Sequence, residues 1–257
     1  MQGALRGRRW IVGSSNHGCW LGSYEHNQQI LLAKYLKEGD VIFDIGAHVG
    51  FYTLLGSVLV GDSGQVVAFE PVPKNLMYLK KHLQINSVSN VAIVEAAVSN
   101  RHGHGRLSSG PSSSMWHLDA RGELGVQTVC LDELVLNAKI PPPNVIKMDI
   151  EGAEVLALNG SAGVVSEFHP VFLLSTHGLM SIRAVVNSSN PPVIICFQSV
   201  RHPLMSVGSY LLFMAPPPEF NCEVRLLGVN GGKRCCVGPP TVKPCERNRR
   251  GRNNDQG

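Results

Sequence analysis

Apolar residues follow two spacings along the chain, one typical of helices and one typical of buried strands. Over residues 25–36 they recur on one helical face, which predicts an amphipathic helix. Residues 41–44 and 65–69 are short, nearly continuous apolar runs bounded by turn residues, as expected of strands buried on both faces. A glycine-containing turn over residues 46–50 separates the first run from a second predicted helix.

Three further apolar runs, at residues 91–94, 145–149 and 171–174, complete the predicted strands. Helical segments lie between the runs, one of them opened by two prolines and another over residues 151–158. Strands and helices that alternate at this spacing are the signature of βαβ units on a parallel sheet. The sequence therefore predicts an α/β fold, a three-layer sandwich around a mostly parallel sheet.

Residues 101–121 interrupt this alternation with a polar stretch rich in Gly and Ser. We interpret the stretch as an irregular insertion or lid that could hold a small hairpin, with an extra strand at 126–129 and a short helix at 131–136 after it. The stretch carries three histidines that could reach a bound acceptor, although histidines scattered through a loop are usually solvated: His102, His104 and His117.

Charge is balanced over most of the chain and basic only towards its end. Residues 216–257 hold eight Lys or Arg and four Asp or Glu, so the net charge of +4 comes from this segment. A neutral body argues against a broad nucleic-acid surface. No apolar stretch is long enough to span a bilayer, and none follows the N-terminal arginines as it would in a signal peptide. We therefore expect a cytoplasmic protein with no nucleic-acid or membrane partner.

Cysteine usage excludes two further classes of protein. The seven cysteines are an odd number, which is a poor basis for a disulfide framework. The late cysteines form no Cys-x-x-Cys pair, and no histidine follows His202, so the sequence predicts no metal site there.

The turn after the first strand suggests a ligand. Gly46 lets the chain turn sharply off the strand, and Gly50 lets the next helix approach the sheet. A dinucleotide-binding loop would carry G-x-G-x-x-G and hold a pyrophosphate, which disfavours a nicotinamide oxidoreductase here. The strand tip carries Asp44 instead, and a carboxylate there repels phosphate and suits a cationic ligand. An ordinary Asp-x-Gly turn is the alternative for this loop alone.

Glu70 strengthens the ligand hypothesis. It ends the next strand, twenty residues after Gly50, where a carboxylate can accept hydrogen bonds from both hydroxyls of a ribose. The simpler alternative is an exposed glutamate at a strand end. We favour the binding role, because the prolines at 71 and 73 would hold the carboxylate rigidly at the sheet edge.

Three segments together resemble the FkbM family of methyltransferases: residues 44–53, 68–71 and 146–154. The most family-specific of them is the last, which reads Lys-x-Asp-x-Glu-Gly-Ala-Glu from Lys147. The resemblance covers about residues 20–178. It implies a class I methyltransferase fold, which is Rossmann-like, and S-adenosyl-L-methionine as the cofactor. It also implies O-methylation of a hydroxyl on a sugar, polysaccharide or secondary metabolite.

The resemblance also implies roles for individual residues. Glu25 and Asp44 would flank the methionine end of the cofactor, Glu70 would bind the ribose, and Ala97 would lie near the adenine. The loop around the cofactor would consist of Gly46, Ala47 and Gly50. One departure is His48, where the family usually has asparagine; the imidazole ring can still donate one hydrogen bond.

A hydroxyl acceptor must lose its proton as it attacks the methyl group, so a general base is expected. Asp149 lies where such folds place the acceptor, outside the carboxyl ends of the strands, and Glu151 and His177 are the other candidates. For Glu151 and Glu154, a carboxylate that interacts with a helix N-terminus is an equally good explanation. Two neighbouring carboxylates at 149 and 151 are too few ligands to predict a bound cation.

Beyond Gly178 the sequence departs from the family pattern, so we expect the C-terminal strands to be atypical or missing. Codons allowed for residues 179–190, read two nucleotides later, can encode a family-like segment, which suggests a frame change near Gly178; a disordered basic tail is the alternative. The predicted division is an extension over 1–24, a methyltransferase domain over 25–178 and an atypical tail over 179–257. A small-molecule or carbohydrate acceptor is the expected partner. The alternative function is that of a non-catalytic cofactor-binding protein or degenerate methyltransferase.

Overall fold

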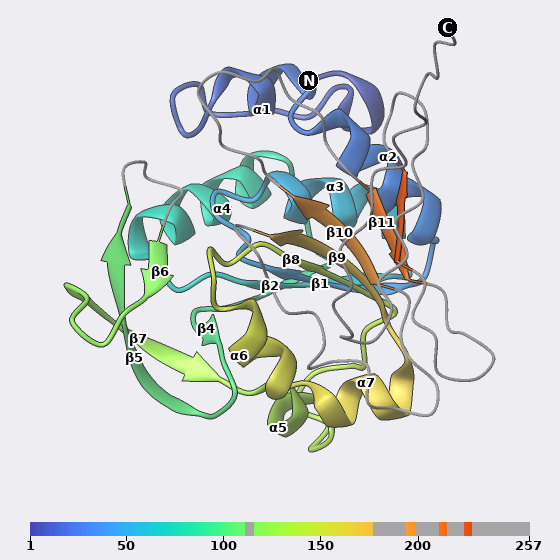
Figure 1. The fold of residues 1–257 in the computed structure, drawn as a ribbon. Coiled ribbons are helices and arrows are strands. Elements are labelled where there is room, and N and C mark those ends of the chain that lie inside the picture. Colours follow the sequence, from blue (N-terminus) through green and yellow to red (C-terminus); the bar gives the residue numbers. More distant parts are fainter. Residues whose placement is uncertain (111–115, 177–193, 199–210, 215–223, 228–257) are drawn as a thin grey trace, which may run out of the picture.

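The computed structural model describes residues 1–110, 116–176, 194–198, 211–214 and 224–227. Its main sheet has the strand order β12-β11-β10-β9-β8-β1-β2-β3 (Figure 1). The strands are β1 (Val41–Ile45), β2 (Gln65–Phe69), β3 (Val91–Val94), β8 (Val145–Met148), β9 (Val171–Thr176), β10 (Ile194–Gln198), β11 (Leu211–Met214) and β12 (Val224–Leu227). Neighbours from β3 across to β10 pair in parallel, whereas β11 and β12 are antiparallel. The predicted α/β fold with a mostly parallel sheet is confirmed.

Helices cover both faces of this sheet (Figure 1). One face carries α2 (His26–Tyr35), α3 (Phe51–Val60) and α4 (Pro73–Ile85), with η1 (Gly3–Leu5) and α1 (His17–Leu21) outside them. The opposite face carries α5 (Leu131–Val135), α6 (Glu154–Asn159) and α7 (Ala162–Phe168). Side chains of β1 alternate between the two layers: Ile42 belongs to the apolar cluster that includes Leu54 of α3, and Phe43 to the cluster that includes Leu158 of α6. The next residue, Asp44, therefore points towards α3.

The inserted segment forms a second sheet of order β4-β7-β5-β6. Its strands are β4 (Ala97–Val98), β5 (Gly103–Ser109), β6 (Trp116–Leu118) and β7 (Leu124–Val129). β5 and β6 form an antiparallel pair, so the predicted hairpin is confirmed and the expected irregularity of the stretch is wrong. Few apolar residues occur in β5, where only Leu107 is buried, which is why hydrophobic alternation did not reveal this strand.

Two boundaries differ from those expected. The helix expected from residue 151 begins at Glu154, because Glu151 (φ 51°) and Gly152 (φ 99°) both adopt left-handed backbone conformations. The C-terminal strands were expected to be atypical or missing. The second of these alternatives is wrong, because β10, β11 and β12 extend the sheet beyond β9. The segment on which the frame-change hypothesis rests, residues 179–190, lies outside the described residues. Across the described part of the chain, no helix is long and apolar enough to cross a bilayer.

Candidate active site

The carboxyl ends of β1, β2 and β8 meet at one edge of the sheet, and the loop after β1 is folded tightly against both neighbours. The backbone N–H groups of Gly46 and Ala47 both donate to the carbonyl oxygen of Phe69, at 3.0 Å, and thereby attach the loop to β2. A Cβ on Gly46, whose φ is +82°, would overlap the carbonyl oxygen of Asp149 in the loop after β8. Only glycine allows both this backbone conformation and this approach.

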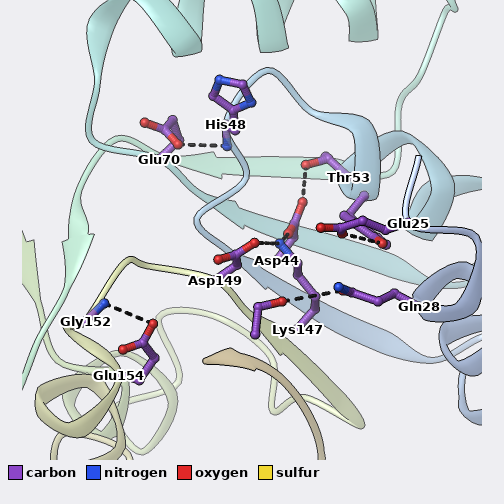
Figure 2. A network of polar contacts seen from close by, with 12 residues as sticks. Glu25, Gln28, Asp44, His48, Thr53, Glu70, Lys147, Asp149, Gly152 and Glu154 are labelled. Carbon is purple, nitrogen blue, oxygen red and sulfur yellow. Dashed lines mark hydrogen bonds and ion pairs between the residues drawn. The ribbon is translucent and has the colours of Figure 1, made fainter. Parts of the chain in front are cut away.

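Glu70 is buried at the end of β2, with 4% of its surface exposed. Its Oε2 accepts a hydrogen bond from the backbone N–H of His48 at 2.8 Å, which links β2 to the loop after β1 (Figure 2). Its Oε1 accepts from the backbone N–H of Val72 at 2.9 Å and from Asn75 Nδ2 at 3.1 Å. Burial raises the pKa of this carboxyl above its ordinary value, and these three hydrogen bonds oppose the rise.

His48 occupies the centre of the loop with φ 52°, a left-handed conformation in which Asn, Asp and His are enriched. This requirement explains how histidine can replace the asparagine expected from the family. Burial lowers the pKa of His48 to about 4, and the nearby Lys147 cation acts in the same direction. The ring is therefore neutral at physiological pH.

Asp44 lies within β1 and is completely buried beneath α3. Its Oδ2 accepts a hydrogen bond from Thr53 Oγ1 at 2.6 Å. Its Oδ1 is 3.8 Å from Lys147 Nζ and is one of two buried side-chain polar atoms in the described chain that have no hydrogen-bond partner. Burial raises the pKa of this carboxyl, whereas Lys147 lowers it.

Lys147 is the cation around which the acidic residues gather (Figure 2). Its Nζ lies 3.8 Å from Asp149 Oδ2, at the same distance from Asp44 Oδ1, and 4.8 Å from the ring centre of Tyr52. Burial alone would lower the pKa of Lys147, but the surrounding carboxylates, Asp149 foremost, raise it above its ordinary value. The ammonium therefore stays charged although only 5% of the residue is exposed.

Glu25 joins the same cluster from the start of α2. Its Oε2 accepts a hydrogen bond from the Tyr52 hydroxyl at 2.9 Å, and its own backbone is left-handed, with φ 47°. Burial raises the pKa of Glu25, and the Lys147 cation opposes the rise. Three carboxylates, Glu25, Asp44 and Asp149, thus share the field of one lysine.

A pocket opens beside this cluster. Of the predicted site residues, five line it: Gly46, Glu70, Ala97, Asp149 and Glu151. The others do not line this pocket: Glu25 and Asp44 interact with Lys147, and Ala47 and Gly50 are buried. His177 lies outside the described residues. Glu154 is buried, and its Oε1 accepts from the backbone N–H of Gly152 at 3.1 Å, which supports the structural explanation for this carboxylate (Figure 2).

Sequence reasoning missed several groups that build this site. One of them is Lys147, whose signal in the sequence is a lysine inside an apolar strand: a buried lysine needs an acidic partner. Asn75, in the first turn of α4, and the hairpin residue Trp116 also line the pocket, and nothing in their local sequence distinguishes them. Among the described residues, no group of three or more His, Cys, Asp or Glu is arranged to hold a metal ion.

Comparison with known proteins identifies the family. Residues 44–191 match the model of the methyltransferase FkbM domain, which is more than half of the chain and extends beyond Gly178. The hexuronic acid methyltransferase AglP of Haloferax volcanii is 26% identical over 145 residues, an alignment that covers 56% of this chain and 59% of the relative. The chain thus matches less than two thirds of the length of that relative.

Two more matches are weaker. A protein-L-isoaspartate O-methyltransferase of Fervidobacterium nodosum is 30% identical over 59 residues, covering 23% of this chain and 30% of the relative. The crystal structure of an FkbM methyltransferase from Methylobacillus flagellatus aligns at a TM-score of 0.40 and 15% identity, covering 83% of this chain and 56% of that chain. Because the family model matches the segment that builds the loop, Glu70 and the lysine motif, the chain belongs to the FkbM family of S-adenosylmethionine-dependent methyltransferases.

Proposed function

We propose that this chain is an S-adenosylmethionine-dependent O-methyltransferase that acts on a hydroxyl of a sugar, polysaccharide or secondary metabolite. One observation carries the proposal: a single pocket is lined both by Glu70, a carboxylate suited to a ribose, and by Asp149, a carboxylate suited to act as a base. Membership of a methyltransferase family supports the reaction class.

The charges around the pocket fit a cationic ligand. Glu25, Asp44 and Asp149 surround Lys147, so that three carboxyl groups share one cation beside the pocket. The Oδ1 atom of Asp44 is buried without a hydrogen bond, and the nearest cation, Lys147 Nζ, lies 3.8 Å away; the hydrogen bond from Thr53 reaches only the other oxygen, Oδ2. When bound, S-adenosylmethionine would supply an activated methyl group on a sulfonium, and its two cationic centres suit this surplus of carboxylate.

Glu70 has limited capacity for a ribose. A carboxylate offers about four lone-pair positions, and three are occupied by the protein itself. Glu70 can thus accept a hydrogen bond from one ribose hydroxyl without losing any of these three. To accept from a second hydroxyl, it must lose the hydrogen bond from Asn75. The three existing bonds fix the carboxylate before any ligand arrives, which reduces the entropic cost of binding.

Asp149 is our first choice for the general base. It lines the pocket and is partly exposed, with 22% of its side chain accessible, so an acceptor hydroxyl can reach it. In the proposed step, one carboxylate oxygen of Asp149 would take the hydroxyl proton while the acceptor oxygen bonds to the methyl carbon; the bond from that carbon to the sulfonium sulfur would break, and S-adenosylhomocysteine would leave. Lys147, 3.8 Å away, holds the carboxylate in place. Glu151 lines the same pocket and is the second candidate.

The sugar assignment draws on the Haloferax volcanii relative, whose name describes a hexuronic acid methyltransferase. We therefore propose hexuronic acids, free or within a glycan, as the first acceptors to test, with neutral hexoses and simple phenols for comparison.

Transfer of labelled methyl groups from S-adenosylmethionine to this acceptor panel tests the function. We expect label on at least one acceptor, and we expect Asp149→Asn to reduce kcat by at least a hundredfold while the affinity for S-adenosylhomocysteine changes little. Glu154→Gln is the matched control, because Glu154 lies on the same segment but does not line the pocket. Binding of S-adenosylhomocysteine with no transfer to any acceptor would instead support a non-catalytic cofactor-binding protein.

A further inference from the structure

One wall of the pocket comes from the inserted sheet. Leu107 of β5 and Trp116 and Leu118 of β6, which we call the hairpin wall, line the pocket. Val72 from the loop after β2 and Ala97 of β4 line it beside them. The same residues belong to one apolar cluster, in which Val72, Ala97 and Leu107 are buried and Trp116 and Leu118 pack against them.

Strand geometry fixes the direction of these side chains. Successive residues of a strand point to opposite faces, so Trp116 and Leu118 share the pocket side while His117 between them is exposed. Leu118 pairs with Leu107 across the two strands. Two hydrogen bonds join β5 to the residues that follow β6. Ser108 Oγ donates to Asp119 Oδ2 at 3.1 Å, and Arg106 Nε donates to the carbonyl of Gly122 at 2.6 Å.

The hairpin wall differs in chemistry from the part of the pocket that carries Asp149 and Glu151. Asp149 and Glu151 line the pocket where it meets the end of β8, whereas the hairpin wall is aliphatic and aromatic. Glu70 and Val72 belong to the same short loop after β2, so a ribose bound by Glu70 would carry its base close to Val72 and to the wall. A partly exposed indole in a pocket offers a flat surface for stacking, which any purine can use.

We propose that the hairpin wall, and Trp116 above all, packs against the purine base of the cofactor, so that the inserted sheet contributes to cofactor binding. This inference rests on the proposed function, since it takes the pocket ligand to be an adenine nucleoside. The base then lies between Val72 and Ala97 on one side and the ring of Trp116 on the other. The histidine at 117 has no part in binding, because its side chain is on the opposite face of β6.

Calorimetric titration of the full chain with S-adenosylhomocysteine and with adenosine tests the proposal. We expect Trp116→Ala to raise the Kd of both ligands by about tenfold or more, and Trp116→Phe, which keeps a ring, to raise it by less than threefold. His117→Ala is the matched control from the same strand and should leave both Kd values unchanged. A second measurement does not depend on the alanine variant folding: adenosine should change the tryptophan emission of the wild type, and this change should be lost in Trp116→Phe.

The outcomes separate the two proposals. If the wild type binds neither S-adenosylhomocysteine nor adenosine, the proposed function itself is contradicted, and the hairpin wall proposal with it. If the wild type binds both, but Trp116→Ala leaves both Kd values unchanged and Trp116→Phe retains the emission change, the base lies elsewhere and only the hairpin wall proposal is overturned. A rise confined to the KM of the acceptor would also overturn it, because the wall would then belong to the acceptor site.

Discussion

Gly46 and Asp149 are in contact through their backbones: the carbonyl oxygen of Asp149 occupies the space that a side chain at position 46 would need. The backbone N–H of Asp149 also donates to the carbonyl of Ile45 at 3.0 Å. The loop after β1 and the loop after β8 are therefore a single packed unit. The candidate base and the candidate cofactor loop are positioned by the same contact.

Gly46→Ala should disrupt this unit. The added Cβ meets backbone, which cannot move aside as a flexible side chain would, and the φ of +82° is unfavourable for alanine as well. Gly152→Ala is the matched control, because Gly152 has φ +99° but nothing within 4 Å of an added Cβ. We expect Gly152→Ala to lower the free energy of unfolding by about 1–2 kcal/mol, the cost of the backbone conformation alone. Gly46→Ala should lose at least about 2 kcal/mol more in urea denaturation, and equal losses would contradict the contact.

Lys147→Met should destabilise the protein, because it leaves Asp44 and Asp149 without their cation. Removal of one partner of a buried ion pair typically costs about 3–5 kcal/mol. Lys80→Met removes an exposed lysine paired with Glu95, with side chains 52% and 54% exposed, and should cost less than about 1 kcal/mol. Adding Asp44→Asn to Lys147→Met should recover part of the loss in chemical denaturation. No recovery in the double variant would show that the charge of Asp44 is not what Lys147 compensates.

Stability should fall below pH 6.5 because of His48. Burial holds its pKa at about 4 in the folded chain against 6.5 ordinarily, so between these values the unfolded chain binds a proton that the folded chain does not. The free energy of unfolding therefore decreases as the pH falls through this window, by about 1–3 kcal/mol for this group. His48→Asn keeps a residue that tolerates the left-handed backbone and removes the titration. Urea denaturation at pH 7 and pH 4.5 should show a smaller pH dependence in the variant, and an identical dependence would contradict the assignment.

The parallel strands and the loop after β1 could be predicted from the sequence because both have strong local signals. Continuous apolar runs mark β1, β2 and β8, and glycine marks the turn. The complete burial of Asp44 could not be predicted from the sequence, because it depends on which face of β1 is covered by helix α3. The contribution of Trp116 to the pocket could not be predicted either. It depends on the pairing of β6 with β5, and the sequence around these strands is rich in Ser and Gly.

The N-terminal residues should contribute to stability through Trp10. Its ring stacks on His82 with centroids 3.7 Å apart, and His82 Nε2 accepts from the backbone N–H of Ile11 at 3.2 Å. The other ring nitrogen of His82 donates to the carbonyl of Val49 at 2.7 Å, which ties this segment to the loop after β1.

Trp10→Ala should therefore cost about 3 kcal/mol or more in thermal or urea unfolding. Trp10→Phe should cost less, because it keeps a ring and removes an indole N–H that has no hydrogen-bond partner in the described structure. Val12→Ala, at a residue 74% exposed, is the control and should stay within about 0.5 kcal/mol of wild type. If Trp10→Ala behaved like Val12→Ala, the segment would not be packed as described.

The central claim is that the pocket at the ends of β1, β2 and β8 binds the cofactor, with Glu70 at the ribose and Asp44 supplying charge from behind. Calorimetric titration of S-adenosylhomocysteine into the wild type, Glu70→Ala and Asp44→Ala tests it most directly. We predict a measurable Kd for the wild type and a Kd at least tenfold higher, about 1.4 kcal/mol, in each variant. Unchanged affinity in both variants would contradict the assignment of this pocket.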